Sequence, residues 1–499
     1  MRRTPTTAMS VLVLAAGLVL GGCTRAAEAP QPRAEGPESQ QYGDEIAKRI
    51  GTDALMAHLR KLQDIADANG NTRAVGTPGY QASVDYVANA LRDKGFDVQT
   101  PEFQVRKFHA GEGSVTAGAD TFSAAALEYT IGTAPGGVTA PLVAARVSDA
   151  PGCKATDYDG LPVQGAVVLV DRGKCPFSDK LMAAGARGAL ALVVADNVDE
   201  QEMGGTLGEK TVVKIPVVGV SKADGARLRG HTGPVTVKID ASVTDVTARN
   251  VIAQTTTGST QDVVMAGAHL DSVPEGPGIN DNGSGVAAVL ETALQMGPAP
   301  KVRNAVRFAF WGAEELGLVG SENYVESLDI EQLRDIALYL NFDMLASPNP
   351  GYFTYDGDQS APLGRDQSPP RVPEGSAGIE RMLVGYLKDA GKTAQDTSFD
   401  GRSDYDGFTL AGIPSGGLFS GAEENMTRDQ AQLWGGRADE PFDPNYHKAT
   451  DTIDAIDSTS LGIQGAGVGY AVGFYAADLR GRNGVPERAD RTRHVVAPS

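Results

Sequence analysis

The strongest constraint on this sequence is an alternation of apolar, strand-like runs with helical periods through residues 244–480. The strand-like runs cover 262–269, 304–312, 336–344 and 412–419, and the helical periods cover 284–296, 318–328 and 377–391. This alternation predicts an α/β fold with a mixed central sheet sandwiched by helices. Ligands bind beyond the carboxyl ends of strands in such sheets, so the residues that follow the apolar runs are candidates for chemistry.

Acids and imidazoles stand at these positions. His269 ends one apolar run, Glu314 and Glu315 follow the next, Asp343 follows a third, and His447 lies in a later loop. Each residue alone has a structural explanation, such as a helix cap or a solvated helix start. Together, carboxylates placed directly after buried strands need a compensating charge, and metal ions are the natural compensation.

The ligand types restrict the choice of metal. Imidazole and carboxylate without thiolate favour zinc, with cobalt or manganese as substitutes. Calcium and magnesium seldom use histidine. Two histidines and three carboxylates exceed the ligand set of one open catalytic zinc ion and fit two ions, about 3.5 to 4 Å apart, that share one carboxylate.

A second, β-rich module interrupts the α/β region. Short valine-rich runs separated by glycines, with one helix-like segment, predict a separate small domain. The stretch from Gly165 to Lys180 resembles the protease-associated (PA) domain, which in its family is usually a non-catalytic lid or interaction element. We place the PA domain at 115–243 and the two parts of the α/β domain at 45–114 and 244–480.

The N-terminus is typical of an export signal. Two arginines precede an apolar run and small residues, which predicts a signal peptide over 1–22 rather than a membrane span. The run from Leu20 to Cys23 resembles the lipobox of bacterial lipoproteins, which implies that Cys23 is lipidated. We therefore expect an exported lipoprotein at the cell surface or in the periplasm, and an ordinary secreted protein is the alternative.

The segments at the two ends of the chain read as flexible. Residues 23–44 are rich in Pro, Ala, Glu and Gln, as expected of a tether, and residues 481–499 read as a basic, frayed tail. If Cys23 carries lipid, Cys153 and Cys175 remain as an even pair, and we expect a disulfide between them. Two free thiols are the alternative.

Charge limits the partners. The net charge of −19 makes nucleic acid an unfavourable partner and is explained by the solvated surface of an exported protein. We expect contact with a membrane only through the lipid anchor, and a monomer. Asp451, Asp454 and Asp457 fit either a calcium site or the acid-rich start of a helix.

Six motifs give the chain a family resemblance. "AHLDS", "NDNGSG", "AEE", "NFDM", "GRSD" and "YHKATDT", in this order, resemble the M28 family of zinc aminopeptidases, with the PA domain inserted before His269. The resemblance implies two zinc ions per chain. It implies that His269 and Asp343 bind one ion, that Glu315 and His447 bind the other, and that Asp281 bridges them.

The same resemblance implies the remaining roles. Glu314 is expected to be the general base, Asp271 to orient His269, and Tyr446 to hold the oxyanion. These roles agree with the need for a proton acceptor beside activated water, a partner that fixes the imidazole tautomer, and a donor aimed at developing charge.

Arg402 and Asp404 in "GRSD" match residues of the family's substrate pocket. Members often have another residue where Tyr405 stands here, and some have a disulfide around the tyrosine–histidine pair that this chain lacks. These departures concern the shape of the pocket and the rigidity of the loop rather than the metal site.

We therefore expect an exported aminopeptidase that hydrolyses the first peptide bond of substrates with a free N-terminus, using metal-activated water. A metallocarboxypeptidase or deacylase of the M20 type is an alternative, although such enzymes insert their extra domain after the double-glutamate motif. Glutaminyl cyclases resemble this fold too but keep a single zinc. A catalytically silent, receptor-like protein is the alternative from another class.

Overall fold

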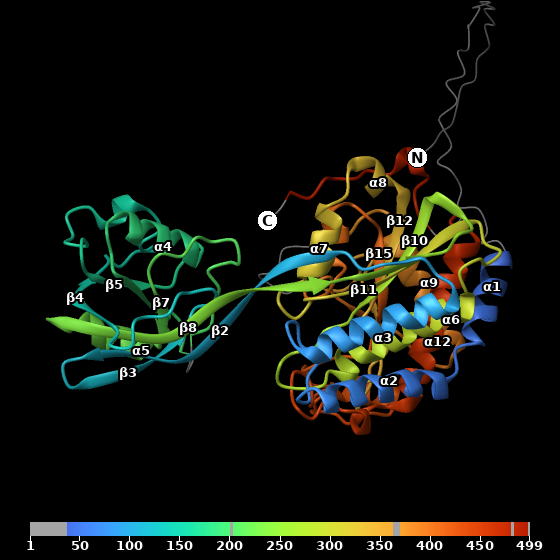
Figure 1. Ribbon diagram of the computed structural model, residues 1–499, viewed down its shortest axis with the longest axis horizontal. Helices are drawn as coiled ribbons and strands as arrows, with labels where there is room; N and C mark the ends of the chain where they lie inside the picture. Colours follow the sequence, from blue (N-terminus) through green and yellow to red (C-terminus); the bar gives the residue numbers. More distant parts are fainter. Residues whose placement is uncertain (1–36, 200–202, 363–369, 481–483, 498–499) are drawn as a thin grey trace, which may run out of the picture.

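The computed structural model describes residues 37–199, 203–362, 370–480 and 484–497, which form two domains joined by a two-stranded ribbon (Figure 1). The predicted signal peptide, Cys23 and the first part of the predicted tether lie outside the described residues. No helix within the described ranges is both long and apolar enough to cross a membrane.

The larger domain is built on a mixed eight-stranded sheet in the order β1-β9-β11-β10-β12-β15-β13-β14. The central strands β11, β10, β12 and β15 run parallel, and antiparallel neighbours flank them. This arrangement confirms the predicted fold class. The strands are β1 (Val98–Gln99), β9 (Val251–Gln254), β10 (Ser259–His269), β11 (Asn304–Trp311), β12 (Ile336–Phe342), β13 (Phe353–Tyr355), β14 (Gln395–Thr397) and β15 (Ser415–Phe419).

Helices cover both faces of the sheet. Along β10, Val264, Ala266 and Ala268 pack into one apolar cluster, while Met265 packs into another on the opposite face. Burial on both faces explains why the strand is apolar throughout instead of alternating. One face carries α1 (Pro37–Ala47), α2 (Thr52–Ala68), α3 (Pro78–Lys94), α6 (Gly285–Met296), α9 (Ser376–Asp389) and α12 (Ser458–Ala477), and the other carries α7 (Val319–Glu326), α8 (Ile330–Asp335) and α10 (Asp406–Leu410).

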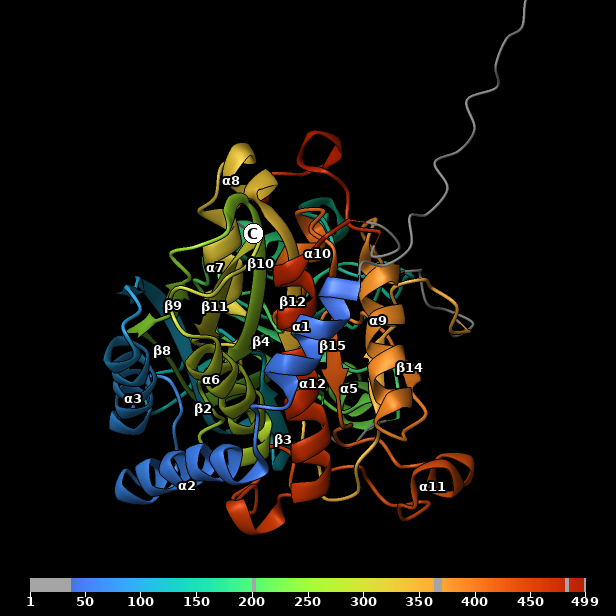
Figure 2. The same cartoon turned by 90° about the vertical axis from the view of Figure 1, so that its right-hand side faces the viewer.

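Helix α1 corrects the predicted tether, which we extended to residue 44. It begins at Pro37 and lies against α12, as Figure 2 shows. Glycines of α12 permit this approach, because a Cβ at Gly469 would stand 2.8 Å from Ile50 and one at Gly473 would stand 3.0 Å from the carbonyl oxygen of Tyr42.

The smaller domain is a closed barrel in the order β2-β3-β7-β6-β5-β4-β8. Strands β2 and β8 pair from Glu102–Arg249 to Ala117–Val235 and extend back to the larger domain as the ribbon in Figure 1. The predicted bounds at 115 and 243 fall inside these strands, since the domains join through a ribbon rather than loops. The elements are β2 (Glu102–Ala117), β3 (Asp120–Ala126), β4 (Val138–Ala144), β5 (Val167–Asp171), α4 (Phe177–Ala186), β6 (Ala191–Ala195), β7 (Val217–Val220), α5 (Lys222–Arg229) and β8 (Pro234–Arg249).

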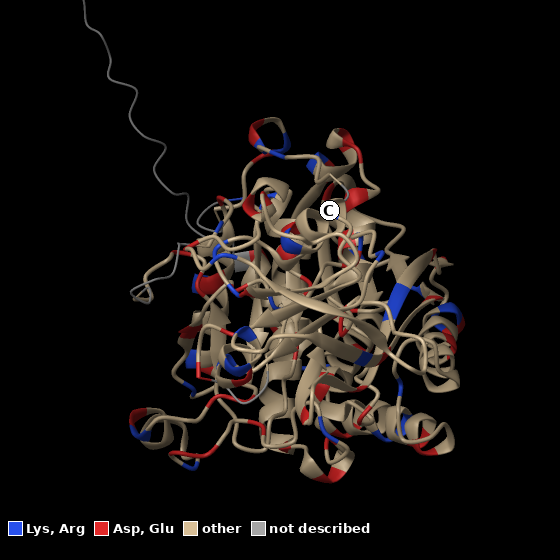
Figure 3. Cartoon of the chain, turned by 90° about the vertical axis from the view of Figure 1, so that its left-hand side faces the viewer, with Lys and Arg blue, Asp and Glu red and all other residues tan. Residues whose placement is uncertain are grey.

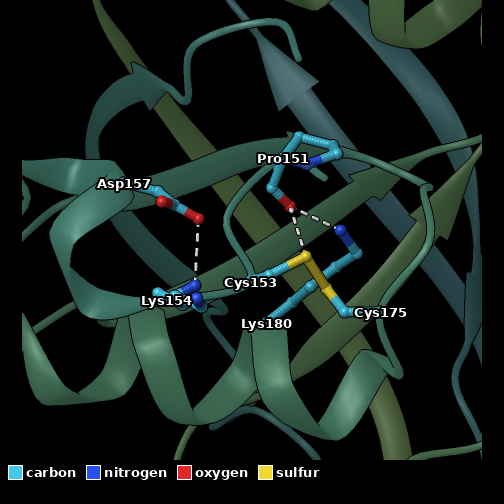
Figure 4. Close-up of a disulfide and its surroundings, with 6 residues drawn as sticks. All are labelled: Pro151, Cys153, Lys154, Asp157, Cys175 and Lys180. Atoms are coloured by element: carbon cyan, nitrogen blue, oxygen red, sulfur yellow. Dashed lines mark hydrogen bonds between the residues drawn. A yellow bond between two sulfur atoms is a disulfide. The ribbon is translucent and has the colours of Figure 1, made fainter. Parts of the chain in front are cut away.

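A disulfide joins Cys153 to Cys175 at the edge of the barrel, as expected (Figure 4). The buried Lys180 of α4 donates a hydrogen bond of 2.5 Å to the carbonyl oxygen of Pro151 beside it. Burial lowers the pKa of Lys180. The bridge and this ammonium group therefore anchor the loop before β5 to the start of α4.

Within the tail that we predicted over 481–499, the described residues 484–497 include side chains packed into the larger domain. Arg491 and Arg493 are buried, and Arg493 donates to the carbonyl oxygens of Leu333, Gly412 and Ile336. The prediction was wrong because arginines in a basic run suggest exposure, whereas these satisfy backbone carbonyls of the larger domain. In Figure 3 acidic and basic residues are interspersed over the loops and helix ends.

Candidate active site

The candidate active site is a cavity of about 440 Å³ beyond the carboxyl ends of the central strands. The strand ends, with two loops, bring their polar side chains to the same place, as expected for an α/β sheet. The lining includes all six residues that we predicted as metal ligands or base, which are His269, Asp281, Glu314, Glu315, Asp343 and His447.

Asp281 lies between the two histidines. Its Oδ1 is 3.1 Å from His269 Nε2, and its Oδ2 is 3.4 Å from His447 Nε2. Asp343 Oδ1 lies 3.3 Å from His269 Nε2, and Glu315 Oε2 lies 3.0 Å from His447 Nε2. The cluster thus has two halves, one histidine and one carboxylate in each, with the carboxylate of Asp281 between them.

The buried oxygens of this cluster test whether cations fit. Asp281 Oδ2, Glu315 Oε1 and Asp343 Oδ1 are buried, yet within the described part of the chain none accepts a hydrogen bond. The nearest ring nitrogens lie 3.4 Å from Asp281 Oδ2 and 3.3 Å from Asp343 Oδ1. A buried carboxylate without a partner is costly, so these oxygens fit metal ions. The chemistry of the donor set, imidazole and carboxylate, fits zinc.

The pKa shifts express the same need for positive charge. Burial would lower the pKa of His269, but Asp343 and Glu314 raise it well above 6.5. Burial also opposes protonation of His447, yet Asp281 and Glu315 raise its pKa to about 10. Without an ion a proton is the available cation, and bound metal would take its place.

Comparison with known proteins agrees with this site. The model of peptidase family M28 matches residues 250–472, and that of the PA domain matches residues 138–228. The chain is 69% identical over 493 residues to the probable lipoprotein aminopeptidase LpqL of Mycobacterium tuberculosis, with 98% of each chain covered. The chain belongs to peptidase family M28.

Other relatives agree with this assignment. Leucine aminopeptidase 2 of Arthroderma otae is 40% identical over 461 residues, covering 91% of this chain and 90% of its own. The aminopeptidase of Aneurinibacillus sp. strain AM-1 superposes with a TM-score of 0.69 at 26% identity, covering 89% of this chain and 98% of its own. BSAP, a zinc aminopeptidase of Bacillus subtilis, superposes with a TM-score of 0.58 at 25% identity, covering 87% of this chain and 97% of its own. The chain is accordingly a zinc metallopeptidase of aminopeptidase type with an inserted PA domain.

In this M28 site Glu314 is the carboxylate not paired with a histidine at short range. Its Oε2 stands 3.9 Å from His269 Nε2, farther than the oxygens of Asp281 and Asp343. Burial raises the pKa of Glu314 well above 4.5, and the neighbouring Glu315 adds to this. Glu314 is thus set apart from the other clustered carboxylates by its distance from the histidines, and its role as general base stays a prediction.

Asp271 supports both glutamates. It is fully buried, and its carboxylate accepts the backbone N–H groups of Glu314 at 3.2 Å and of Glu315 at 3.3 Å. Its backbone carbonyl lies 3.2 Å from His269 Nδ1, closer than its carboxylate at 3.8 Å. The contact to His269 that we expected from the side chain is thus made more closely by the main chain.

Sequence reasoning missed several supporting residues. Asp451 is buried and accepts the N–H groups of Asn280 and Asp281 at 2.8 and 3.0 Å, so it holds the Asp281 loop. Ser403 Oγ donates to Asp343 Oδ2 at 2.6 Å. Both residues lie inside motifs quoted above, Ser403 in "GRSD" and Asp451 in "YHKATDT", and that position is the signal that could have indicated these roles.

A buried arginine holds the loop after β10. Arg73 donates to the carbonyl oxygens of Leu270, Pro277 and Gly278, and burial lowers its pKa to about 10. Nothing in the N-terminal sequence pointed to this contact. Asp457, the third acid considered for calcium, accepts the N–H of Ser460 and caps α12.

Tyr446 and Arg402 also line the cavity. The ring of Tyr446 stacks on His447 with centroids 3.8 Å apart, and Arg402 Nη2 donates to Tyr446 Oη at 3.2 Å. Asp404 differs from the prediction that it contacts substrate. It is buried outside the cavity lining, and burial raises its pKa to about 7.

Proposed function

We propose that this protein is a di-zinc aminopeptidase that removes the N-terminal residue of peptides. The observation that carries the proposal is the position of Asp281 between His269 and His447, with partnerless carboxylate oxygens around it. Such a cluster suits two metal ions that share one carboxylate.

The ligand roles follow from the two halves of the cluster. His269 and Asp343 would hold one zinc ion, His447 and Glu315 would hold the other, and Asp281 would contact both. Bound zinc supplies a Lewis acid for the scissile carbonyl and lowers the pKa of water. Ser403 and Asp451 keep the ligands oriented through their hydrogen bonds.

The chain's own residues then manage the proton and the oxyanion. Glu314 takes the proton of the attacking water and passes it to the leaving amine. Tyr446 donates a hydrogen bond from its phenol O–H to the developing oxyanion. The oxygen of that phenol already accepts from Arg402, so the phenol proton is free to point into the cavity.

The remaining lining supports recognition of the first residue. The carboxylates near the metal site suit a free α-ammonium group, since opposite charges attract strongly where water is excluded. The other side of the cavity carries apolar and aromatic side chains, which suit a large apolar side chain. They are Met344, Phe353, Tyr355, Phe419 and Phe442.

We also propose that the protein is exported and held to a membrane by lipid on Cys23. The signal-like residues 1–22 support export, and the relative named as a probable lipoprotein aminopeptidase supports the lipid anchor. The disulfide between Cys153 and Cys175 fits an oxidising compartment.

The test compares leucine 4-nitroanilide with its N-acetylated form, using protein whose zinc has been counted by mass spectrometry. We expect about two zinc ions per chain, turnover of the free amine alone, and loss of activity on chelation that added zinc restores. Preference for the blocked compound would replace the aminopeptidase by a deacylase or carboxypeptidase. One zinc ion at full activity would contradict the two-metal proposal.

A further inference from the structure

Glu423 lies beside the active site without lining its cavity. It follows β15 in the loop that also carries Glu424, and only Glu424 contributes to the cavity lining. Glu423 Oε1 lies 2.9 Å from Arg402 Nη2, whereas Glu424 Oε1 lies 3.6 Å from Arg402 Nη1. Glu423 is therefore the closer carboxylate partner of Arg402, and it stands outside the space where substrate binds.

A line of contacts leads from Glu423 to the metal site. The Nη2 atom of Arg402 that meets Glu423 also donates to Tyr446 Oη at 3.2 Å. The Tyr446 ring stacks on His447 with an angle of 24° between the planes, and His447 Nε2 is 3.0 Å from Glu315. The orientation of the phenol thus depends on two contacts. Its ring stacks on His447, and its oxygen accepts from Arg402 Nη2.

The hydrogen bond between Arg402 and Tyr446 can have only one donor. Arginine has donors only, so the oxygen of Tyr446 must accept from Arg402, and its own proton remains for another acceptor. This hydrogen bond requires the guanidinium to stay in place.

Arg402 needs a second contact to stay there. Its side chain is half exposed, at 49%, and a long exposed side chain samples many rotamers. A carboxylate at hydrogen-bond distance fixes one of them, because charge-assisted hydrogen bonds are short and directional. Exposed ion pairs add little to stability, so the contribution of Glu423 is to geometry rather than to folding.

We propose that Glu423 is a positioning residue of the peptidase reaction, which holds Arg402 so that the phenol proton of Tyr446 faces the carbonyl oxygen of the substrate. This inference rests on the proposed function, in particular on the role of Tyr446. Glu423 itself touches neither substrate nor metal.

A double-mutant cycle in the full-length zinc-loaded enzyme tests it, with leucine 4-nitroanilide as substrate. We expect Tyr446→Phe to lower kcat about 100-fold, as for loss of an oxyanion donor. We expect Glu423→Ala to lower kcat about tenfold with KM nearly unchanged, because only the transition state uses the aligned phenol. Glu423→Gln should recover most of that loss, since an amide oxygen still accepts from Arg402.

The decisive measurement is Glu423→Ala in the Tyr446→Phe background, where we expect no further loss of kcat. Glu440→Ala is the matched control, because Glu440 is an exposed glutamate bonded at 2.6 Å to Arg437, away from Tyr446. It should leave kcat and KM unchanged. Zinc content should be equal in all variants.

Three outcomes overturn the inference. An equal loss in both backgrounds, or a rise in KM with kcat unchanged, would mean that Glu423 acts on substrate or structure independently of Tyr446. Full kcat in Tyr446→Phe would overturn the inference together with the oxyanion role proposed for Tyr446. Only this last result reaches the proposed function, so the two failures are distinguishable.

Discussion

The active-site edge of the larger domain and the matching edge of the PA barrel begin from the same sequence pattern. In both, a buried parallel strand ends in or before an aspartate, as at Asp343 after β12, Asp171 in β5 and Asp196 after β6. In the barrel a nearby arginine meets each acid. Arg229 lies 2.6 Å from Asp171, and Arg172 lies 3.3 Å from Asp196.

At the active-site edge no arginine or lysine in the described residues is within ion-pair distance of the six clustered ligand and base residues, and three of their oxygens have no donor. One oxygen of Asp196 also lacks a donor, but its other oxygen accepts from Arg172 and from the N–H of Asn197. The comparison teaches that similar strand-end acids differ in their partners: arginines of the chain pair with those of the barrel, whereas the predicted ligands at the active-site edge have no such partner among the described residues.

The largest expected effect removes the base. Glu314→Gln keeps the size of the side chain but cannot accept the proton of water, so we expect kcat to fall about 1,000-fold. Zinc content and the midpoint of thermal unfolding should stay the same. Asp171→Asn in the barrel is the matched change at the other edge and should leave kcat unaltered. Near-normal turnover by Glu314→Gln would sink the assigned mechanism.

The next effect concerns ligand orientation. Ser403→Ala removes the 2.6 Å hydrogen bond to Asp343 Oδ2. We expect zinc affinity to fall about tenfold, since hydrogen bonds to metal ligands typically have effects of this size. Competition with a fluorescent chelator measures the dissociation constant.

Ser221→Ala provides the comparison in the barrel. Ser221 caps α5 through its bond to the N–H of Asp224, and its loss should leave zinc affinity unchanged. Equal zinc affinity in Ser403→Ala and the wild type would show that Asp343 needs no such support.

How much the sequence revealed depended on the range of each interaction. The clustering of the predicted ligands could be foreseen because His269 and Asp343 adjoin apolar runs, and strand ends meet at one edge of a sheet. Arg73 was not, because its carbonyl partners lie about 200 positions away and carry no side-chain signature. The buried position of the C-terminal Arg493 could not be predicted for the same reason.

The predicted domain boundaries missed the junction for a different reason. Composition changes near residues 115 and 243, but strands β2 and β8 cross both positions without a break. Pro101, by contrast, has no N–H for the ladder and separates β1 from β2. A proline in the sequence therefore marks this break, whereas the change in composition does not mark the domain junction.

A third effect concerns stability and separates the two domains. Replacing Cys153 and Cys175 by serine opens a loop whose ends are 22 residues apart, which should destabilise the barrel by about 3 kcal/mol. We expect the barrel to unfold at a lower temperature by calorimetry and to become more sensitive to proteases. The kcat should change little, because the bridge belongs to the barrel and every residue that lines the cavity belongs to the larger domain. A parallel loss of kcat would show that the barrel controls the site.

The smallest expected effect lies where the two domains touch. Glu322 of α7 packs on Gly407 of α10, and near it Lys210 of the PA domain lies 3.8 Å from Glu326. Burial, with Asp406 and Glu326, raises the pKa of Glu322 to about 7. The folded protein therefore binds this proton more tightly than the unfolded chain, so Glu322 reduces stability progressively as pH rises from about 4.5 to about 7.

Glu322→Gln should remove that loss. Because Glu322 is partly exposed and screened by solvent, we expect an increase in the unfolding midpoint of about 1 °C above pH 7 and none at pH 4.5. Glu331→Gln is a control of opposite sign, because Arg488 and Arg334 lower the pKa of Glu331. Its ionised form stabilises the fold above about pH 4.5, so that variant should lose stability at pH 7 and match the wild type in acid. Parallel pH profiles for both variants would mean that neither carboxylate is coupled to folding.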